Sequence, residues 1–222
     1  MKTAERPVSR TPMSRLDDIT QELRLRICLM DATQTHILYE NALAEEFGVS
    51  RTPIRQVLQR LAYEHQVETR TGIGTVVPQL DPAGAAHDFM TLSGALELAA
   101  QTAEPLLDQT TRDLLGDIDT HIAQFSSVQP LSRSTIFAVS SKLIVLAKNL
   151  NPEPIMADAT ASLHWRALRR LLQQDGPGSR EKQAQILGRL CRNLLVQTDA
   201  RAALQMIALA MREFGKSFST QM

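Results

Sequence analysis

Cysteine is scarce in this chain of 222 residues, which contains only Cys28 and Cys191. The two lie in separate helical patterns, and neither has a partner at a spacing typical of metal ligands. Isolated cysteines of this kind indicate buried thiols in a reducing compartment.

Long apolar runs are also missing, because no stretch approaches the length that a membrane-spanning helix needs. The N-terminus lacks the apolar segment of a secretory signal, and residues 1–13 resemble a loose polar arm. The sequence therefore predicts a soluble cytoplasmic protein without a membrane partner.

The chain has no net charge, since 24 Lys and Arg balance 24 Asp and Glu. Even residues 1–80 hold ten basic and ten acidic side chains, so the basic surplus typical of a nucleic-acid-binding domain is missing. Neutrality does not exclude DNA binding, because affinity depends on where the charges lie. From Arg51 to Val77 four arginines face only Glu64 and Glu68, and we expect a strong salt dependence if this segment binds DNA.

Catalytic motifs are absent too. No Ser, His and acidic residue form a nucleophile motif, no Gly-rich loop joins a strand to a helix, and no Cys or His cluster has zinc spacing. Ser132, Ser134, Ser140 and Ser141 are more typical of helix caps or packing than of nucleophiles. We predict no enzyme, no catalytic residue and no cofactor.

What is present is a helix-turn-helix pattern over residues 47–61. Gly48 suits the reversal after a first helix, and Ser50 is placed to cap a second one. One face of the second helix is apolar, with Ile54, Val57, Leu58 and Leu61. The opposite face carries side chains that suit phosphates and base edges, namely Arg51, Thr52, Arg55 and Gln59.

An amphipathic helix with exposed arginines is common by itself, and its surroundings decide the interpretation. Residues 41–47 predict a short preceding helix, with Leu43 and Ala44 facing inward. Two segments rich in β-branched residues, 67–70 and 75–77, flank a glycine-bearing hairpin tip at 71–74. Helix, helix, turn, helix and hairpin predict a winged helix-turn-helix domain over residues 14–79.

The character of the chain changes after a linker at residues 80–84, where Asp81-Pro82 disfavours a continuous helix. Residues 85–218 show helical periodicity and no strand pattern, with breaks at Gln129-Pro130, at 151–154 and at 175–178. We therefore predict a mainly α protein whose second domain is an all-α bundle of about six helices, with a tail at 219–222. The predicted apolar stripes include Leu92, Leu96, Leu114, Ile118, Leu143, Ile144, Leu168, Leu171, Leu190, Leu194, Leu204 and Ile207.

Residues 41–61, with the core Gly-Val-Ser-Arg-Thr-Pro-Ile-Arg, resemble the DNA-binding domain of GntR-family bacterial transcription factors, and the resemblance covers about residues 14–78. It implies that Ser50, Arg51, Thr52 and Arg55 contact an operator in double-stranded DNA. It also implies that the wing tip, Thr71 and Gly72, enters the neighbouring minor groove. The chain departs from the family at His65-Gln66, where a Gly-Leu step is usual, and we expect His65 to be a surface or turn residue.

The second domain resembles the FadR/FCD branch of that family, through its helical architecture and through residues 95–103, 146–149 and 198–203. In that branch the bundle dimerises and senses a small effector, and many members bind a divalent metal through one Asp and three His. Here the corresponding positions fall near Ile136, Ser140, Gly188, Leu209, Ala210 and Glu213. The five histidines, His36, His65, His87, His121 and His164, lack the family spacing, so we predict no metal and a structural or surface role for His164.

An effector that binds without a metal needs polar side chains within the bundle. The candidates are Glu97, Gln101, Arg133, Asn149, His164 and Arg169, with Lys142 and Arg166 as further polar residues. A buried arginine suits a carboxylate or phosphate, although the spacing of Arg166, Arg169 and Arg170 favours a solvated helix face. An organic acid and an acyl or terpenoid-like effector remain equally open.

Two hypotheses follow. The first is a homodimeric, effector-responsive transcriptional regulator, most often a repressor in this family, that binds a palindromic operator. The alternative is a constitutive DNA-binding or protein-interaction module whose bundle only dimerises. A bundle cavity lined by at least two convergent polar side chains favours the first hypothesis, and a solidly packed bundle favours the second.

Overall fold

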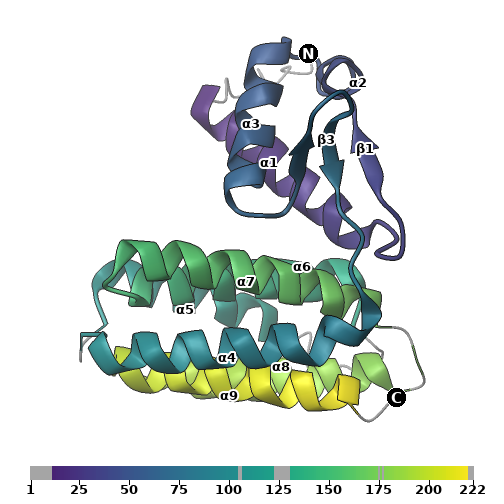
Figure 1. Cartoon of the computed structure of the whole chain (residues 1–222). Coiled ribbons are helices and arrows are strands. Elements are labelled where there is room, and N and C mark those ends of the chain that lie inside the picture. The colour runs from purple at the N-terminus through teal and green to yellow at the C-terminus, as the bar shows by residue number, and fades with distance from the viewer. Residues whose placement is uncertain (1–11, 105–106, 123–130, 175, 177, 220–222) are drawn as a thin grey trace, which may run out of the picture.

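A computed structural model describes residues 12–104, 107–122, 131–174, 176 and 178–219. Three predicted features therefore lie outside the described residues: most of the arm at residues 1–13, the break at Gln129-Pro130, and most of the tail at 219–222. Figure 1 shows a small N-terminal domain resting on a layer of long helices. The whole described part is mainly α, with a winged helix followed by a helical bundle, as the sequence predicts.

The N-terminal domain contains three helices and a three-stranded antiparallel sheet in the order β1-β3-β2. Arg15, near the start of α1, donates to the carbonyl oxygens of Phe47 and Gly48 at 3.2 and 3.1 Å and so braces the turn between α2 and α3. Gly48 has φ 59°, the left-handed conformation that favours glycine. The elements are α1 (Pro12–Leu29), β1 (His36–Leu38), α2 (Glu40–Glu46), α3 (Arg51–Tyr63), β2 (Glu68–Arg70) and β3 (Gly74–Val77).

Strand β1 is not predicted from the sequence, which indicates strands in this domain only at residues 67–70 and 75–77. It pairs with β3, with His36 opposite Val77 and Leu38 opposite Thr75. A three-residue strand is too short to show an alternating pattern, and its partner lies almost forty residues further along the chain. The wing is therefore a sheet of three strands, which fixes the hairpin more firmly than two strands would.

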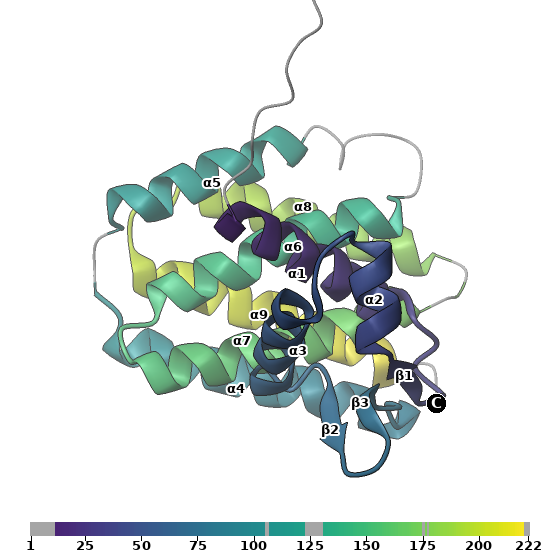
Figure 2. The same ribbon diagram turned by 90° about the horizontal axis from the view of Figure 1, so that it is seen from above.

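The C-terminal domain contains six α-helices in the part of the chain that the structure describes. Helix α4 packs along α9, where the ring centroids of Phe89 and Phe214 lie 6.0 Å apart. Helix α7 lies on the side of the bundle that faces the N-terminal domain, and it contacts α1 (Figures 1 and 2). A short 3₁₀ turn, η1 (Pro82–Gly84), leads into the bundle. The helices are α4 (Ala85–Thr102), α5 (Gln109–Ile122), α6 (Arg133–Leu150), α7 (Pro154–Gln173), α8 (Ser179–Leu195) and α9 (Ala200–Ser219).

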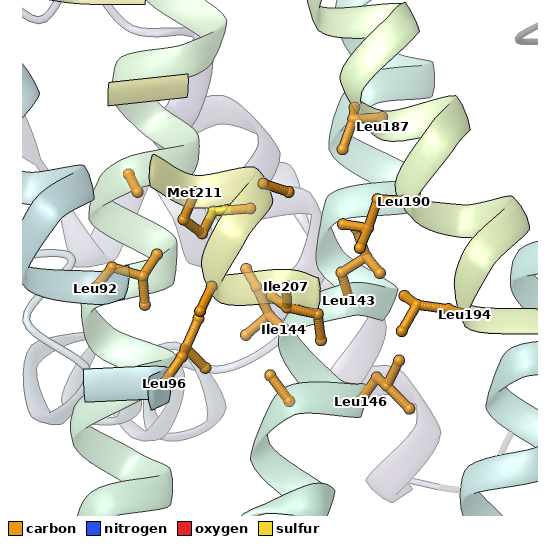
Figure 3. Packing of buried hydrophobic residues seen from close by; sticks show 14 of the residues in the cluster. Leu92, Leu96, Leu143, Ile144, Leu146, Leu187, Leu190, Leu194, Ile207 and Met211 are labelled. Atoms are coloured by element: carbon orange, nitrogen blue, oxygen red, sulfur yellow. The ribbon is translucent and has the colours of Figure 1, made fainter. Parts of the chain in front are cut away.

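The bundle core consists mainly of aliphatic side chains that interdigitate between the helices (Figure 3). Most predicted stripe residues are buried, but on α5 Leu115 rather than Leu114 is the buried leucine. The helix is thus rotated slightly from the predicted phase, because two adjacent leucines leave the periodicity ambiguous. Both cysteines are buried as predicted, and burial raises the pKa of each thiol to about 12.

Helix α1 belongs to both domains. Ile19, Leu23 and Ile27 pack into the core of the winged helix, whereas Cys28 belongs to the core of the bundle. The two domains therefore meet through a packed contact, with α1 lying across the bundle (Figure 2).

Candidate DNA-binding surface

Helix α3 separates its residues into two faces as the sequence predicts. Ile54, Val57, Leu58 and Leu61 are buried in the domain core. The other face is exposed and carries Arg51, Thr52, Arg55, Gln56 and Gln59. Gln56 was missed from the sequence, although it lies four residues after Thr52 and so falls on the same face.

The start of α3 lies at the end of the domain that faces away from the bundle. Its last residue, Tyr63, contacts α7, and thirteen residues of helix are about 20 Å long. Strand β3 runs toward the bundle, so the hairpin tip before it also lies at the far end (Figure 1). The arginine-bearing turn of α3 and the wing tip thus lie on the part of the molecule that is free to approach another macromolecule.

Ser50 occupies the N-cap position of α3, but its side chain makes no capping hydrogen bond. This corrects the expectation of a side-chain cap. The hydroxyl remains at an exposed helix N-terminus, where the partial positive charge of the backbone favours phosphate.

The arginines between residues 51 and 77 differ in how they are held. Arg60 pairs with Asp17 and Glu64, and Arg70 pairs with Glu68. Arg51 forms no ion pair within the described part of the chain and donates a hydrogen bond of 3.5 Å to the Asn41 side chain, although the Glu40 carboxylate attracts its charge. Arg51, at the start of α3, is therefore the least firmly held of these guanidinium groups.

Arg55 is held by Glu40, at the first position of α2. Its Nη2 lies 2.9 Å from Oε2 and its Nε lies 3.3 Å from Oε1, in a two-point pair. Hydrogen bonding to Arg55 lowers the pKa of Glu40, so this carboxylate stays charged at neutral pH. Glu40 both orients Arg55 and competes with any phosphate or base for it.

The wing tip is a turn closed by a hydrogen bond of 3.1 Å from the Ile73 backbone N–H to the Arg70 carbonyl. Gly72 is the third residue of this turn and has φ 77°, a conformation that favours glycine. Thr71, Gly72 and Ile73 are all exposed, with Ile73 at 53%. The tip is thus uncharged and partly apolar, which suits contact with sugars in a groove more than with phosphates.

Replacing Gly72 by valine should weaken DNA binding by a few-fold while the domain stays folded. A Cβ at this position would meet no atom within 4 Å, so the change strains only the backbone of the tip, by about 1–2 kcal/mol. Gly72→Asn is the matched control, because asparagine tolerates positive φ, and it should keep nearly all of the affinity. Circular dichroism together with fluorescence anisotropy on duplex DNA checks both variants. Global unfolding of the valine variant would show that the tip is required for the core.

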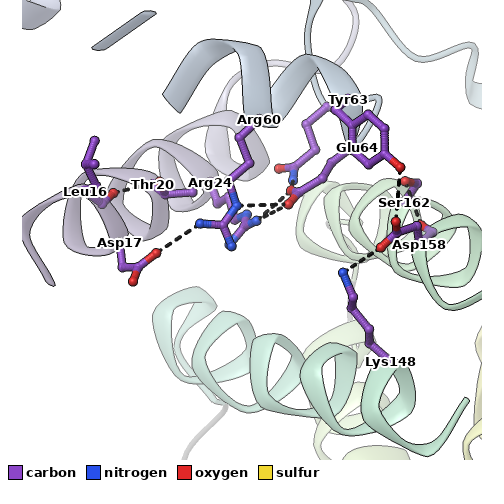
Figure 4. Close-up of polar contacts among 11 residues, drawn as sticks. Leu16, Asp17, Thr20, Arg24, Arg60, Tyr63, Glu64, Lys148, Asp158 and Ser162 are labelled. Carbon is purple, nitrogen blue, oxygen red and sulfur yellow. Dashed lines mark hydrogen bonds and ion pairs between the residues drawn. The ribbon is translucent and has the colours of Figure 1, made fainter. Parts of the chain in front are cut away.

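The C-terminal end of α3 is anchored to the bundle (Figure 4). The Tyr63 hydroxyl donates to Asp158 Oδ2 on α7 at 3.1 Å, and Lys148 on α6 binds the other oxygen of that carboxylate at 2.6 Å. Behind α3, Glu64 receives two hydrogen bonds of 2.6 Å from Arg24, whose guanidinium lies 4.6 Å from the centre of the Trp165 ring. The orientation of α3 therefore depends on α7 as well as on its own domain.

His65 accounts for the departure from the family pattern after α3. It is exposed and has φ 56°, the left-handed conformation in which glycine is the usual residue. The chain makes the same backbone turn with histidine, so the fold does not require the glycine.

The N-terminal domain is a winged helix-turn-helix, a class of domain that binds DNA. Its defining features are the turn between α2 and α3, the exposed arginine-bearing face of α3 and the antiparallel wing. Residues 16–77 match the family described as bacterial regulatory proteins, gntR family. The chain thus carries a GntR-family helix-turn-helix domain. The match stops at the end of β3, so assignment of the bundle to the FadR/FCD branch stays a prediction.

One curated relative is described as an uncharacterized HTH-type transcriptional regulator in an unstable DNA locus of Streptomyces ambofaciens. It is 40% identical over 88 residues, and the matched segment spans 40% of this chain and 37% of the relative. Two solved structures share the overall fold at low identity. E. coli McbR/YncC is 17% identical, covering 94% of this chain and 97% of its own, with a TM-score of 0.56. A protein of Rhodococcus sp. RHA1 described as a GntR transcriptional regulator is 16% identical, covering 94% and 99%, with a TM-score of 0.52.

The predicted effector residues do not converge on one site. Gln101 and Asn149 are exposed, Glu97 is engaged by Arg212, and Arg133 lies at the first position of α6. His164 lies in the bundle core, whereas Arg169 faces the N-terminal domain and donates to the Pro78 carbonyl at 2.6 Å. A single pocket built from all six residues is thus excluded by their positions.

The interpretation of α7 as a helix with an arginine-rich solvated face was wrong for two of its three arginines. Arg169 and Arg170 are only 4% and 5% exposed, and Arg166 alone remains largely solvated. Helix periodicity predicts one buried face, whereas α7 is covered on one side by the bundle and on another by the winged helix and the linker. The winged helix and the linker are distant from α7 in the sequence, so the spacing of residues within α7 could not show that they bury its second side.

His164 is buried, and neither of its ring nitrogens has a hydrogen-bond partner among the described residues. It lines a cavity of about 20 Å³ together with Ser140, whose hydroxyl is also unpartnered. A cavity of this size holds about one water molecule. Across the described residues, no three His, Cys, Asp or Glu side chains come together in a way that could hold a metal.

Acid should destabilise the protein through His164. Burial lowers the pKa of this imidazole from 6.5 to about 4. Between these values the unfolded chain binds a proton that the folded chain does not, so stability falls as the pH falls through this window. We expect a loss of about 2 kcal/mol between pH 7 and pH 5 from this group. Urea unfolding at both pH values should show a smaller difference in His164→Leu and an unchanged one in His87→Leu, an exposed control.

Proposed function

We propose that this protein is a DNA-binding transcriptional regulator that inserts α3 into the major groove and the wing tip into the adjacent minor groove. The observation that carries the proposal is the exposed face of α3, where Arg51 and Arg55 project from the first turns of a helix whose other face is buried. Arginine is the side chain that most often reads guanine in the major groove. The GntR-family match over this segment supports the same conclusion.

We also propose that the protein acts as a homodimer on a palindromic site, with repression as the favoured outcome. A single domain with so little net charge has few phosphate contacts, and a second copy would double them. The resemblance of the bundle to the FadR/FCD branch supports dimerisation through that domain. The descriptions of the similar proteins as transcriptional regulators support this role in general terms.

The packing of the bundle bears on the effector. A cavity of about 20 Å³ around His164 has no room for an organic effector, and this favours the alternative of a bundle that serves only to dimerise. An effector response then requires a site other than this cavity. In the described part of the chain, no helix is long and apolar enough to cross a membrane.

Mass photometry of the protein on a duplex that carries its preferred sequence tests the dimer. We expect two chains per duplex, and a palindrome cut to one half-site should lose most of the affinity. One chain per duplex at saturation, with full affinity for the half-site, would contradict the homodimer and leave the DNA-binding proposal intact.

A further inference from the structure

A cleft of about 290 Å³ opens where the winged helix, the linker and α7 meet. Its walls come from segments far apart in the chain, including Cys28 of α1, Gln66 after α3, Pro78 after β3, and Trp165 and Arg169 of α7. The volume lies near the lower end of the range for small-molecule sites, roughly 300–1,000 Å³. The cleft can therefore take a small metabolite, which the cavity at His164 cannot.

Arg169 is the unusual residue of this cleft. It is 4% exposed, and its Nη1 donates to the Pro78 carbonyl at 2.6 Å. Its Nε and Nη2 are buried and make no hydrogen bond to any residue that the structure describes. Within the described residues, no carboxylate forms an ion pair with Arg169, in contrast to Arg170 beside it, which pairs with Asp88.

A buried guanidinium with two unpartnered donors is costly, because charged groups lose hydration on burial. Burial lowers the pKa of Arg169, even though Asp31 attracts its charge from a distance. Nε and Nη2 form one edge of the planar guanidinium, the edge that binds two oxygens of a carboxylate or phosphate at once. The two unpartnered nitrogens of Arg169 are thus placed to donate side by side to two oxygens of a carboxylate or phosphate.

The acidic side chains that line the cleft are already engaged. Glu68 accepts from Arg70, with its Oε2 3.1 Å from Nη2, and Asp81 accepts from the Ala83 backbone N–H at 3.0 Å. Arg166, which also lines the cleft, pairs with Asp88 through Nε and is half-exposed. None of the side chains that line the cleft therefore provides a carboxylate for Arg169, and Arg166 adds a second positive charge there.

We propose that this cleft binds a small metabolite through a carboxylate or phosphate group held by the Nε and Nη2 edge of Arg169. The two nitrogens are buried, so binding has to move Arg169 or the atoms around it. Pro78 directly follows β3, so a displacement of the Pro78 carbonyl that Arg169 binds passes to the wing. The cleft would thereby couple an anionic effector to the DNA-binding surface, an inference that rests on the proposed regulatory function.

Isothermal titration calorimetry of the full chain with inorganic phosphate and with succinate, in chloride buffer without DNA, tests the site. We expect saturable binding of at least one probe, weakened at least tenfold in Arg169→Gln. Arg192→Gln, which removes an exposed arginine of the bundle, should bind as the wild type does. Phosphate binding without succinate binding identifies a phosphorylated ligand, and the reverse identifies an organic acid.

Arg169→Lys provides a second variant, because it keeps the charge and removes the two-donor edge. If Arg169→Gln does not fold, binding by Arg169→Lys that equals the wild type contradicts the site. Absence of saturable binding of both probes to the wild type also contradicts it. A chain that binds DNA but neither probe refutes the cleft alone, whereas a chain that binds a probe but no DNA refutes the proposed function alone.

Discussion

Replacing Asp88 by alanine is expected to destabilise the protein by about 3–5 kcal/mol, the range for breaking a buried ion pair. Asp88 is 5% exposed in the first turn of α4, and one of its oxygens accepts from Arg170 Nε at 2.8 Å and from Arg166 Nε at 2.9 Å. Removing the carboxylate leaves Arg170 buried, with only the Asp81 carbonyl as a partner. It also removes a negative charge from the start of α4, where the helix dipole favours one.

Urea unfolding measures this loss, and a surface pair in the same bundle serves as the control. Glu213 pairs with Arg189 on exposed faces of α9 and α8, so Glu213→Ala should cost less than about 1 kcal/mol. The double variant Asp88→Leu, Arg170→Met should recover much of the stability, because it removes both buried charges. A loss below 1 kcal/mol in Asp88→Ala would show that this ion pair does not hold α4 to α7.

Arg51→Ala and Arg55→Ala should each weaken operator binding by about 1–3 kcal/mol, which is the discrimination that an arginine provides when it reads a base. The loss should be larger for Arg55, because its removal leaves the Glu40 carboxylate without its partner on the DNA-facing side. By the same reasoning, Glu40→Gln should strengthen binding a few-fold. It frees Arg55 and removes a negative charge.

Fluorescence anisotropy on the preferred duplex checks these variants, with Arg192→Ala on the bundle as a control of equal charge change. Arg51 and Arg55 are both exposed, so their replacement should leave the unfolding curve unchanged. Unchanged DNA affinity in both alanine variants would remove the assignment of α3 as the reading helix.

The winged helix could be predicted almost completely because its signals are local. The glycine turn, the apolar spacing of Ile54, Val57, Leu58 and Leu61, and the hairpin at residues 71–74 each lie within one short segment. Strand β1 could not be predicted, because a strand of three residues depends on a partner supplied by β3.

The surroundings of α7 escaped the sequence analysis for a related reason. Helical spacing shows which residues face a core, but it does not show that a second domain covers the opposite side. Arg169 and Arg170 are buried by the linker and the winged helix, so their environment depends on contacts across about ninety residues. The candidate site at the domain junction consequently becomes visible only in the folded chain.

The most direct test of the DNA-binding account is selection from random duplex DNA at physiological salt, run in parallel with the wild type and with the Arg51→Ala, Arg55→Ala double variant. The account predicts a short motif with two symmetric half-sites for the wild type, and loss of that motif for the folded double variant. A folded wild-type protein that enriches no sequence, or a double variant that enriches the same motif, would contradict it.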